Sequence, residues 1–579
     1  MLNLPYYDQW WVTATIAKAF EGKFSFSDLI SLHNDSIKFF PRLIFIALAY
    51  LTKYDIRYES LLSFLMACII SFNLYRLSQI TALNKETSIA SQKTKSLLLI
   101  FGANLLIFSP IQYEAWLNGL SSVVFISLAC ITTCINVIYS QFKLKTKFLI
   151  CVCLSTISTF SFANGALCWL VCLPIFAFSK SWYDLSRKKW LIVGLLFSFA
   201  ANIAIYYHYS HNYFKSYHFS LSKLLVEQKQ EVLYYFLSFL GNPLAWGTSL
   251  GSLTLAQNVG TVLLLLLILS FVYLLKLIRD TDLSYRMLGW LMLGIYAVVS
   301  AALAMFGRLK YYSVDQSLSS RYTTFSLYLA VSLIYLAAII VDDFKKRGLL
   351  KYSSCFIRTI QSLATVCITL HLFTSIYAVE QMSNTKQARL QQKTCLLFIN
   401  VAPDKECIER FYVGDVYSGQ RLANGIDGLK PIANSINKLG WLNPPLLESR
   451  KVQDLHKSSQ KDDNNYGYFD AVSKLGERQF IASGWGILPD RKEPAHSVIV
   501  TYDNDNGDSI MFKAFEVGDE RRDVAKFFNN DAYSHSGWHG TFSSALVPTG
   551  SVKVNAWAFD TNTGKAAKLN SSHLIQNDL

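Results

Sequence analysis

Two short segments of the sequence place a single carboxylate among aromatic residues. Asp8 lies in YYDQWW at residues 6–11, and Glu114 lies in SPIQYEAW at residues 109–116. Aromatic belts of this kind are typical of the membrane–water interface, where an acidic side chain is a candidate for function. A carboxylate beside a substrate hydroxyl can act as a general base. The sequence therefore offers Asp8 and Glu114 as candidate catalytic residues.

Basic and polar residues near other apolar segments have the chemistry to bind a phosphorylated sugar. Guanidinium groups bind phosphate or pyrophosphate through paired hydrogen bonds, and histidine or asparagine can hydrogen-bond a sugar hydroxyl. The candidate substrate-binding residues are His33, Asn34, Arg42, Arg308, Arg321 and Tyr322. Taken one at a time, Asp8, Glu114 and Arg321 also fit ordinary interfacial residues. The interpretation depends on their lying on one side of a membrane.

The composition indicates what kind of protein must position these residues. Of the 579 residues, 52% are hydrophobic, 14% are aromatic and 16% are charged, whereas soluble domains carry about 25% charged residues. The net charge of +14 comes from residues 1–379, which hold 31 Lys/Arg against 16 Asp/Glu. Because this excess lies between long apolar runs, it indicates membrane topology rather than nucleic-acid binding. The composition thus excludes a purely cytosolic protein and a disordered chain.

Ten apolar segments approach or exceed the length of about 20 residues that a membrane-spanning helix needs. The predicted spans are 57–78, 96–112, 119–140, 147–163, 165–180, 189–207, 258–277, 287–306, 322–341 and 355–378. The fourth and fifth are short and are separated by the turn FANG at residues 162–165. Residues 232–250 are also apolar but contain Gly241-Asn242-Pro243, which favours a re-entrant or broken helix.

The connections between the spans alternate in charge. Five of them carry 18 Lys/Arg and are therefore expected in the cytoplasm: residues 76–95, 143–147, 180–189, 276–286 and 345–351. The segments 1–56, 113–118, 208–231, 307–321 and everything after about residue 379 then face outward. Ten spans would place both chain ends outside, yet no apolar helix precedes residue 57. We expect either a further helix upstream, for eleven in total, or an N-terminal segment that is translocated without one.

The part of the chain after residue 379 is expected outside the cytoplasm. Residues 380–465 form a connecting segment that ends in a polar linker, and residues 466–579 form a β-sandwich domain. Its predicted strands are 478–488, 496–503, 509–517, 541–547 and 551–559, with turn residues between them.

Two groups of residues in this domain have both a structural and a functional interpretation. The tryptophans Trp485, Trp538 and Trp557 fit core positions better than exposed sites for sugar stacking. The acidic run at residues 503–508 fits a turn better than a calcium loop, because it lacks a later bidentate glutamate.

Most of the 11 cysteines lie in or beside apolar spans. There a thiol behaves as a small hydrophobe, and the spacings do not resemble those of a metal site, so no metal ligands are predicted. Cys395 and Cys407 differ because both fall in the outward-facing part. An oxidising compartment favours a disulfide between them.

The order of these features resembles that of GT-C-type integral-membrane glycosyltransferases, and of their poorly characterised bacterial members in particular. The resemblance covers about residues 5–340. It rests on an acid in the first outward loop (Asp8), a His- and Arg-bearing segment before the next span (His33 and Arg42), a second acid (Glu114), and Arg321-Tyr322 at the start of a late span. The fold it implies is a polytopic α-helical membrane domain, followed here by the extracytoplasmic β-sandwich.

The resemblance implies a reaction as well as a fold. A sugar would move from a polyprenyl-phosphate-linked donor to a glycan or other cell-envelope acceptor, within the lipid of the bacterial cytoplasmic (inner) membrane. Asp8 would deprotonate the acceptor, and Arg42, Arg308 or Arg321 would stabilise the leaving phosphate. Glu114 would orient the acceptor or Asp8, or help hold a divalent cation, although no cofactor is certain. The main alternative is a non-enzymatic protein, either a lipid-linked-glycan transporter or a cell-envelope scaffold that displays its β domain.

Overall fold

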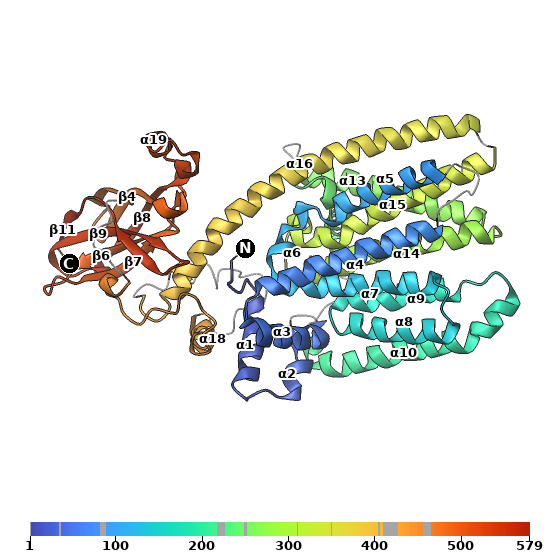
Figure 1. Cartoon of the computed structure of the whole chain (residues 1–579), viewed down its shortest axis with the longest axis horizontal. Coiled ribbons are helices and arrows are strands. Elements are labelled where there is room, and N and C mark those ends of the chain that lie inside the picture. The colour runs from blue at the N-terminus through green and yellow to red at the C-terminus, as the bar shows by residue number, and fades with distance from the viewer. Residues whose placement is uncertain are drawn as a thin grey trace. The chain divides into compact units, whose positions relative to one another are not determined.

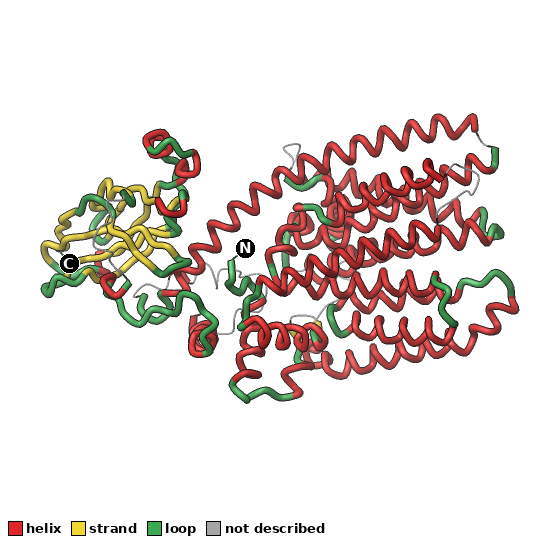
Figure 2. Tube along the Cα trace, viewed as in Figure 1, coloured by secondary structure: helices red, strands yellow, loops and turns green. Residues whose placement is uncertain are grey.

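The computed structural model of the chain describes residues 2–33, 36–81, 89–216, 226–247, 252–309, 311–348, 350–402, 406–408, 426–455 and 465–578. The chain divides into two compact units. The helical unit comprises residues 18–52 and 56–382, and the C-terminal unit comprises residues 1–17, 53–55 and 383–579. Figure 1 traces the chain through both, and Figure 2 shows that long helices dominate the former and strands the latter.

Long apolar helices make up most of the helical unit. Among the described residues, eight helices are long and apolar enough to cross a membrane, and each overlaps a predicted span. They coincide with or overlap α4 (Arg57–Thr81), α5 (Ile89–Ile107), α7 (Ser122–Tyr139), α10 (Trp182–Ser216), α13 (Ser252–Lys276), α14 (Thr281–Arg308), α15 (Ser320–Lys346) and α16 (Leu350–Leu397). This set of helices suits a multi-pass membrane protein.

The other two predicted spans are short helices. α8 (Leu144–Thr159) and α9 (Leu167–Ala177) have 16 and 11 residues, fewer than a full span needs, and the 3-10 turn η3 (Ala163–Ala166) lies between them. The predicted break near residue 242 is confirmed, because α12 (Lys229–Gly241) ends in the 3-10 turn η4 (Asn242–Leu244).

The faces of the long helices differ in burial. α7, α14 and α15 have mostly buried side chains, whereas α4, α5 and α10 expose large apolar groups such as Phe64, Phe101 and Phe197. Exposed apolar faces of this kind suit contact with lipid tails. α12 and α13 approach most closely at Gly241 and Gly260, where a Cβ atom would lie 1.9 Å from a backbone oxygen of the other helix. Only glycine fits at these two positions.

Short elements precede α4, in a region for which the sequence predicted only an outward segment. They are α1 (Gln9–Phe20), α2 (Phe26–Ile30), β1 (Leu32–His33), β2 (Ser36–Ile37) and α3 (Phe39–Thr52). α3 is apolar but has only 14 residues, so it is too short for a full span.

Two antiparallel sheets form the core of the C-terminal unit. One has the order β10 (Lys565–Lys568), β9 (Gly550–Asp560), β6 (Ser497–Asp503) and β7 (Ser509–Phe515), with β11 (His573–Asn577) also paired to β9. The other has the order β3 (Gly467–Lys474), β4 (Gln479–Leu488) and β5 (Glu493–Pro494), with β8 (Gly537–Ser543) on β4. The short helices α17 (Glu406–Ile408), α18 (Ile426–Lys438) and α19 (Arg522–Phe527) complete the unit.

Apolar residues cover both faces of the β9-containing sheet. The inner face packs on the second sheet, with Phe469, Val498 and Trp538 in the shared core. The outer face is covered by Phe398 and Val452, which pack on strand residues that include Trp557. Residues before position 466 therefore supply part of the core of this unit.

Four of the five predicted strands are confirmed, and one is shifted. The strand predicted at residues 541–547 is β8 (Gly537–Ser543), after which Ser544–Leu546 form a 3-10 turn. The start of β8 was not predicted because its two glycines have a low propensity for β-strands. They are required by close packing, since a Cβ atom at Gly540 would lie 2.4 Å from the ring of Phe515.

The structural interpretations of the tryptophans and of the acidic run also hold. Trp538 and Trp557 are buried, and Trp485 is half-buried with its ring 5.9 Å from that of Phe528. The acidic run forms a turn in which the Asn504 side chain accepts two backbone N–H groups, and Asp508 pairs with Lys451.

Candidate functional site

The carboxylate of Glu114 lies at the start of α15. Glu114 belongs to the short helix α6 (Tyr113–Leu117), and its Oε2 accepts a hydrogen bond from the backbone N–H of Arg321 at 3.0 Å. Ser320 strengthens the junction, because its Oγ accepts the N–H of Glu114 at 3.2 Å and donates to the carbonyl of Ile111 at 2.7 Å. Glu114 therefore satisfies one of the unpaired N–H groups at a helix N-terminus, where a negative charge is favourable.

Two arginines and two tyrosines gather around the same junction, and we name them the arginine–tyrosine cluster: Arg308, Arg321, Tyr235 and Tyr322. Arg308 is the last residue of α14, and Arg321 is the second residue of α15. The Arg321 guanidinium is exposed and lies 5.5 Å from the ring centre of Tyr322. The charges of both arginines reach the phenol of Tyr235 on α12. The Arg321 guanidinium thus lies over one phenol ring, and the charges of both arginines reach a second.

The broken helix α12 holds this cluster in place. Asn242 in η4 donates to the carbonyls of Ser317 and Ser319, both at 3.2 Å, and the Oγ atoms of Ser238 and Ser317 lie 2.6 Å apart. Ser317 lies in the 3-10 turn η5 (Val314–Leu318), which leads into α15. The sequence predicts the break at residues 241–243, but no motif there marks Tyr235 or Asn242 as a site residue.

His33 and Arg42 have internal contacts in the helical unit. Arg42 is 3% exposed, and its Nη1 donates to the carbonyls of Leu29 and Ser31 at 2.8 and 2.6 Å. These contacts tie α3 to the segment after α2. Burial, together with the charges of Lys38 and Arg42, holds the pKa of His33 well below its usual value. Both side chains are therefore buried, and their contacts with a donor stay predictions.

The remaining predicted site residues lie in different parts of the chain: one in the C-terminal unit, four in the helical unit and one outside the described residues. Asp8 is half-buried, belongs to the C-terminal unit, and directly precedes α1, with its carbonyl accepting the N–H of Trp11. Glu114, Arg308, Arg321 and Tyr322 belong to the helical unit. Asn34 lies outside the described residues.

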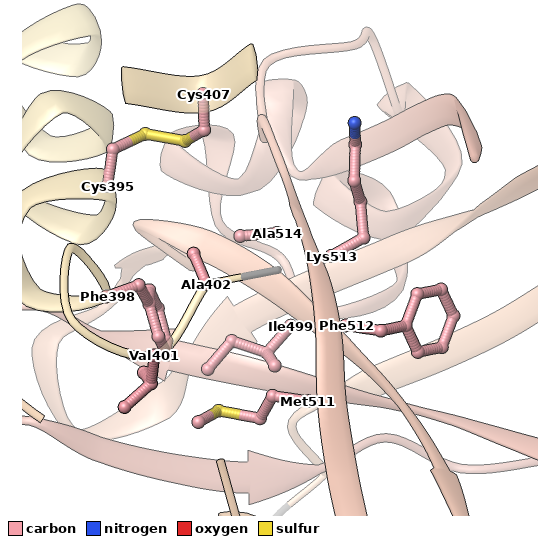
Figure 3. A pocket seen from close by; sticks show the side chains of 10 residues that line it. All are labelled: Cys395, Phe398, Val401, Ala402, Cys407, Ile499, Met511, Phe512, Lys513 and Ala514. Atoms are coloured by element: carbon pink, nitrogen blue, oxygen red, sulfur yellow. A yellow bond between two sulfur atoms is a disulfide. The ribbon is translucent and has the colours of Figure 1, made fainter. Parts of the chain in front are cut away.

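The disulfide predicted between Cys395 and Cys407 is present, with Cα atoms 5.7 Å apart. It borders a cavity of about 40 Å³ in the C-terminal unit, lined mainly by apolar side chains such as Phe398, Ile499 and Met511 (Figure 3).

Among the described residues, Glu114 does not belong to a group of side chains that could hold a divalent cation. In that part of the chain, the ligand atoms of Cys134, Cys168 and Cys172 lie within 4.8 Å of one another, and Glu114 is not part of this group. Glu114 is instead engaged with the N-terminus of α15.

Comparisons with protein-family models, with curated proteins and with solved structures found no match to this chain.

Proposed function

We propose that the chain is a membrane glycosyltransferase that moves a sugar from a polyprenyl phosphate to an acceptor at the outer face of the bacterial cytoplasmic membrane. The observation that carries this proposal is the arginine–tyrosine cluster at the junction of α14 and α15. A lipid phosphate is an anion with an apolar tail, so it requires cationic groups at the end of an apolar bundle.

The cluster meets the requirements of a leaving phosphate. When the glycosidic bond breaks, negative charge develops on the phosphate oxygens, and nearby guanidinium groups stabilise it through charge-assisted hydrogen bonds. Arg321 lies in the first turn of α15, whose N-terminus already holds the Glu114 carboxylate, so the guanidinium itself would bind the phosphate. Phe239, whose ring lies 5.3 Å from that of Tyr322, is fully buried and packs behind the cluster.

Glu114 acts as a positioning residue in this proposal. It holds the first turn of α15 and thereby the backbone of Arg321. A carboxylate has about four acceptor sites, so Glu114 can also orient an acceptor hydroxyl while it keeps the N–H bond. Asp8 belongs to the C-terminal unit, and its role as general base, which the sequence resemblance implies, is proposed separately from the cluster. The usual contribution of a general base is about 10²–10⁴ in rate.

The orientation follows from charge. The basic connections, which include Lys145 and Lys346, lie at the opposite ends of the helices from the cluster, and the positive-inside rule places them in the cytoplasm. The cluster and the C-terminal unit would then be extracytoplasmic. Cysteine-accessibility labelling of Lys145→Cys and Asp505→Cys in intact cells tests this, and labelling of the former alone would contradict it.

The distribution of charge along the helices favours interfacial chemistry over transport. A transporter usually carries ionisable groups near the middle of the membrane. α7 has no charged residue, and the charged residues of α13, α14 and α15 lie within about two turns of their ends.

The direct experiment is a reconstituted assay with a pool of polyprenyl-phosphate sugars that follows donor loss and the gain of glycosylated acceptor. Wild type should consume a donor, and Asp8→Asn, which cannot accept a proton, should abolish transfer without changing expression. Equal rates for the two would show that Asp8 is structural. If wild type consumes no donor, the transporter or scaffold alternative replaces the enzyme.

A further inference from the structure

Four cysteines from three helices meet inside the helical unit. Cys134 lies on α7, Cys151 on α8, and Cys168 and Cys172 one turn apart on α9, and each is 0% exposed. The three helices pack against one another (Figure 1).

The sulfur atoms are close enough to share one ligand. Those of Cys134 and Cys168 lie 3.8 Å apart, and those of Cys168 and Cys172 lie 3.9 Å apart. The sulfur atoms of these three residues all lie within 4.8 Å of one another. Cys151 is buried on the neighbouring helix α8, outside the group of three whose sulfur atoms lie within that distance. All four are free cysteines, so the cluster does not arise from disulfides.

These distances match a mononuclear thiolate site. Zinc binds cysteine sulfur at about 2.3 Å in a tetrahedron, and the edge of such a tetrahedron is about 3.8 Å. Thiolates select soft ions, above all zinc and cuprous copper. Cys134, Cys168 and Cys172 fill three positions of such a tetrahedron, and with Cys151 as the fourth ligand the site would be closed, which is the arrangement of a structural site.

Neighbouring groups supply a polar environment for this cluster. The Ser155 hydroxyl donates to the Cys168 sulfur at 3.2 Å, the kind of outer contact that orients a metal ligand. Lys147 lies one turn before Cys151 on α8, and its charge acts on that thiol. Four thiolates around Zn²⁺ would carry a net charge of −2, and Lys147 would offset one of these two negative charges.

We propose that Cys134, Cys151, Cys168 and Cys172 bind one thiophilic closed-shell metal ion, Zn²⁺ or Cu⁺, and that this ion ties α7, α8 and α9 together. On binding, the ion displaces protons from the thiols to water. A metal ion that joins these helices would stabilise them, because the predicted spans at α8 and α9 are too short to cross a membrane by themselves. The proposal is independent of the proposed glycosyltransferase activity.

The test is the metal content of the full chain purified in detergent after expression with added zinc or copper. Elemental analysis by mass spectrometry should find about one ion per chain, and the element found identifies the ion. Cys172→Ser removes a ligand and should lower metal affinity by more than the roughly 10- to 100-fold that loss of an outer contact causes. Cys153→Ser is the matched control, because Cys153 is exposed on α8, two residues from Cys151, and it should retain the ion.

A second measurement requires no variant to fold. Titration of the metal-free wild type with Co²⁺ should produce the intense sulfur-to-cobalt charge-transfer absorption of a tetrahedral thiolate site, and zinc should abolish it. Wild type that contains neither zinc nor copper and gives no charge-transfer absorption would overturn the proposal and leave the thiols as packed hydrophobic groups. Iron with inorganic sulfide at these cysteines would also overturn it, because the site would not be mononuclear.

Discussion

The carboxylate of Glu114 and the backbone N–H of Arg321 are joined by a 3.0 Å hydrogen bond, although the two residues are 207 positions apart. The contact ties the short helix α6 to the first turn of α15. It therefore fixes where the Arg321 guanidinium emerges, and it gives Glu114 a role that depends on an acceptor oxygen as well as on charge.

Glu114→Gln and Glu114→Ala should therefore differ. Glutamine keeps an acceptor for the N–H of Arg321 and loses only the charge, worth about 0.3–1 kcal/mol at a helix N-terminus. Alanine loses the cap as well, which costs roughly 0.5–2 kcal/mol. Thermal unfolding in detergent should rank wild type, Glu114→Gln and Glu114→Ala in that order, and Glu114→Ala should raise the donor KM more than it lowers kcat. Equal loss of kcat in both variants with unchanged unfolding would indicate that the carboxylate takes part in the chemistry.

Arg42→Ala should reduce stability rather than donor binding. The buried guanidinium donates to the carbonyls of Leu29 and Ser31, and hydrogen bonds that involve a charged group contribute about 1.5–3 kcal/mol. Arg42→Lys retains a donor and should lose less. The measurement is the unfolding midpoint together with the donor KM. A variant with wild-type stability and a raised donor KM would show instead that Arg42 binds the donor.

A fragment of the C-terminal unit that begins near residue 383 should be more soluble than one that begins at residue 466. The shorter fragment lacks Phe398 and Val452, which cover the outer face of the sheet around Trp557. An exposed apolar face of that kind promotes aggregation. Size-exclusion chromatography and circular dichroism of both fragments provide the measurement. A monomeric, β-rich fragment from residue 466 would show that this cover is dispensable and would support the predicted domain limit.

The C-terminal unit should lose stability in acid through Asp560. Burial favours the protonated form of Asp560, but hydrogen bonds from His496, the backbone N–H of Asn562 and Thr563 outweigh it, so its pKa lies below the usual value. A carboxyl whose folded pKa is depressed stabilises the fold above its unfolded pKa of about 3.9, and this stabilisation disappears as the pH falls toward the folded value.

Urea unfolding of the fragment from residue 383 between about pH 5 and pH 2 tests this linkage. Wild type should lose stability more steeply with falling pH than Asp560→Asn does. Asp505→Asn is the control, because Asp505 is exposed in a turn, and it should follow wild type. Parallel curves for wild type and Asp560→Asn would assign the acid sensitivity to other groups.

Apolar runs and turn residues predicted most of the fold. The predicted span at 57–78 corresponds to α4, and the predicted strand at 551–559 corresponds to β9, because both are apolar runs that hydropathy detects directly. The strand β8 was displaced because Gly540 is there for close packing, which propensity does not reveal. The helices α1 and α3 were missed because both are shorter than a span.

The candidate site was only partly predictable, for a similar reason. Arg321 and Tyr322 adjoin in the sequence, so they were found, but Tyr235 joins them through the fold of α12. The cysteine cluster was missed because three of its members lie on different helices. Only Cys168 and Cys172 show a local spacing, and that spacing also fits ordinary helix packing.

The most direct test of the central claim is the donor KM of Arg321→Ala in proteoliposomes with a polyprenyl-phosphate sugar. Arg279→Ala is the matched control, because Arg279 is exposed at the opposite end of α14, whose 28 residues span about 42 Å. We predict that Arg321→Ala raises the KM by roughly 10- to 150-fold, the equivalent of about 1.5–3 kcal/mol for a lost charge-assisted contact, while Arg279→Ala matches wild type. Equal KM values for wild type, Arg321→Ala and Arg279→Ala would contradict the account.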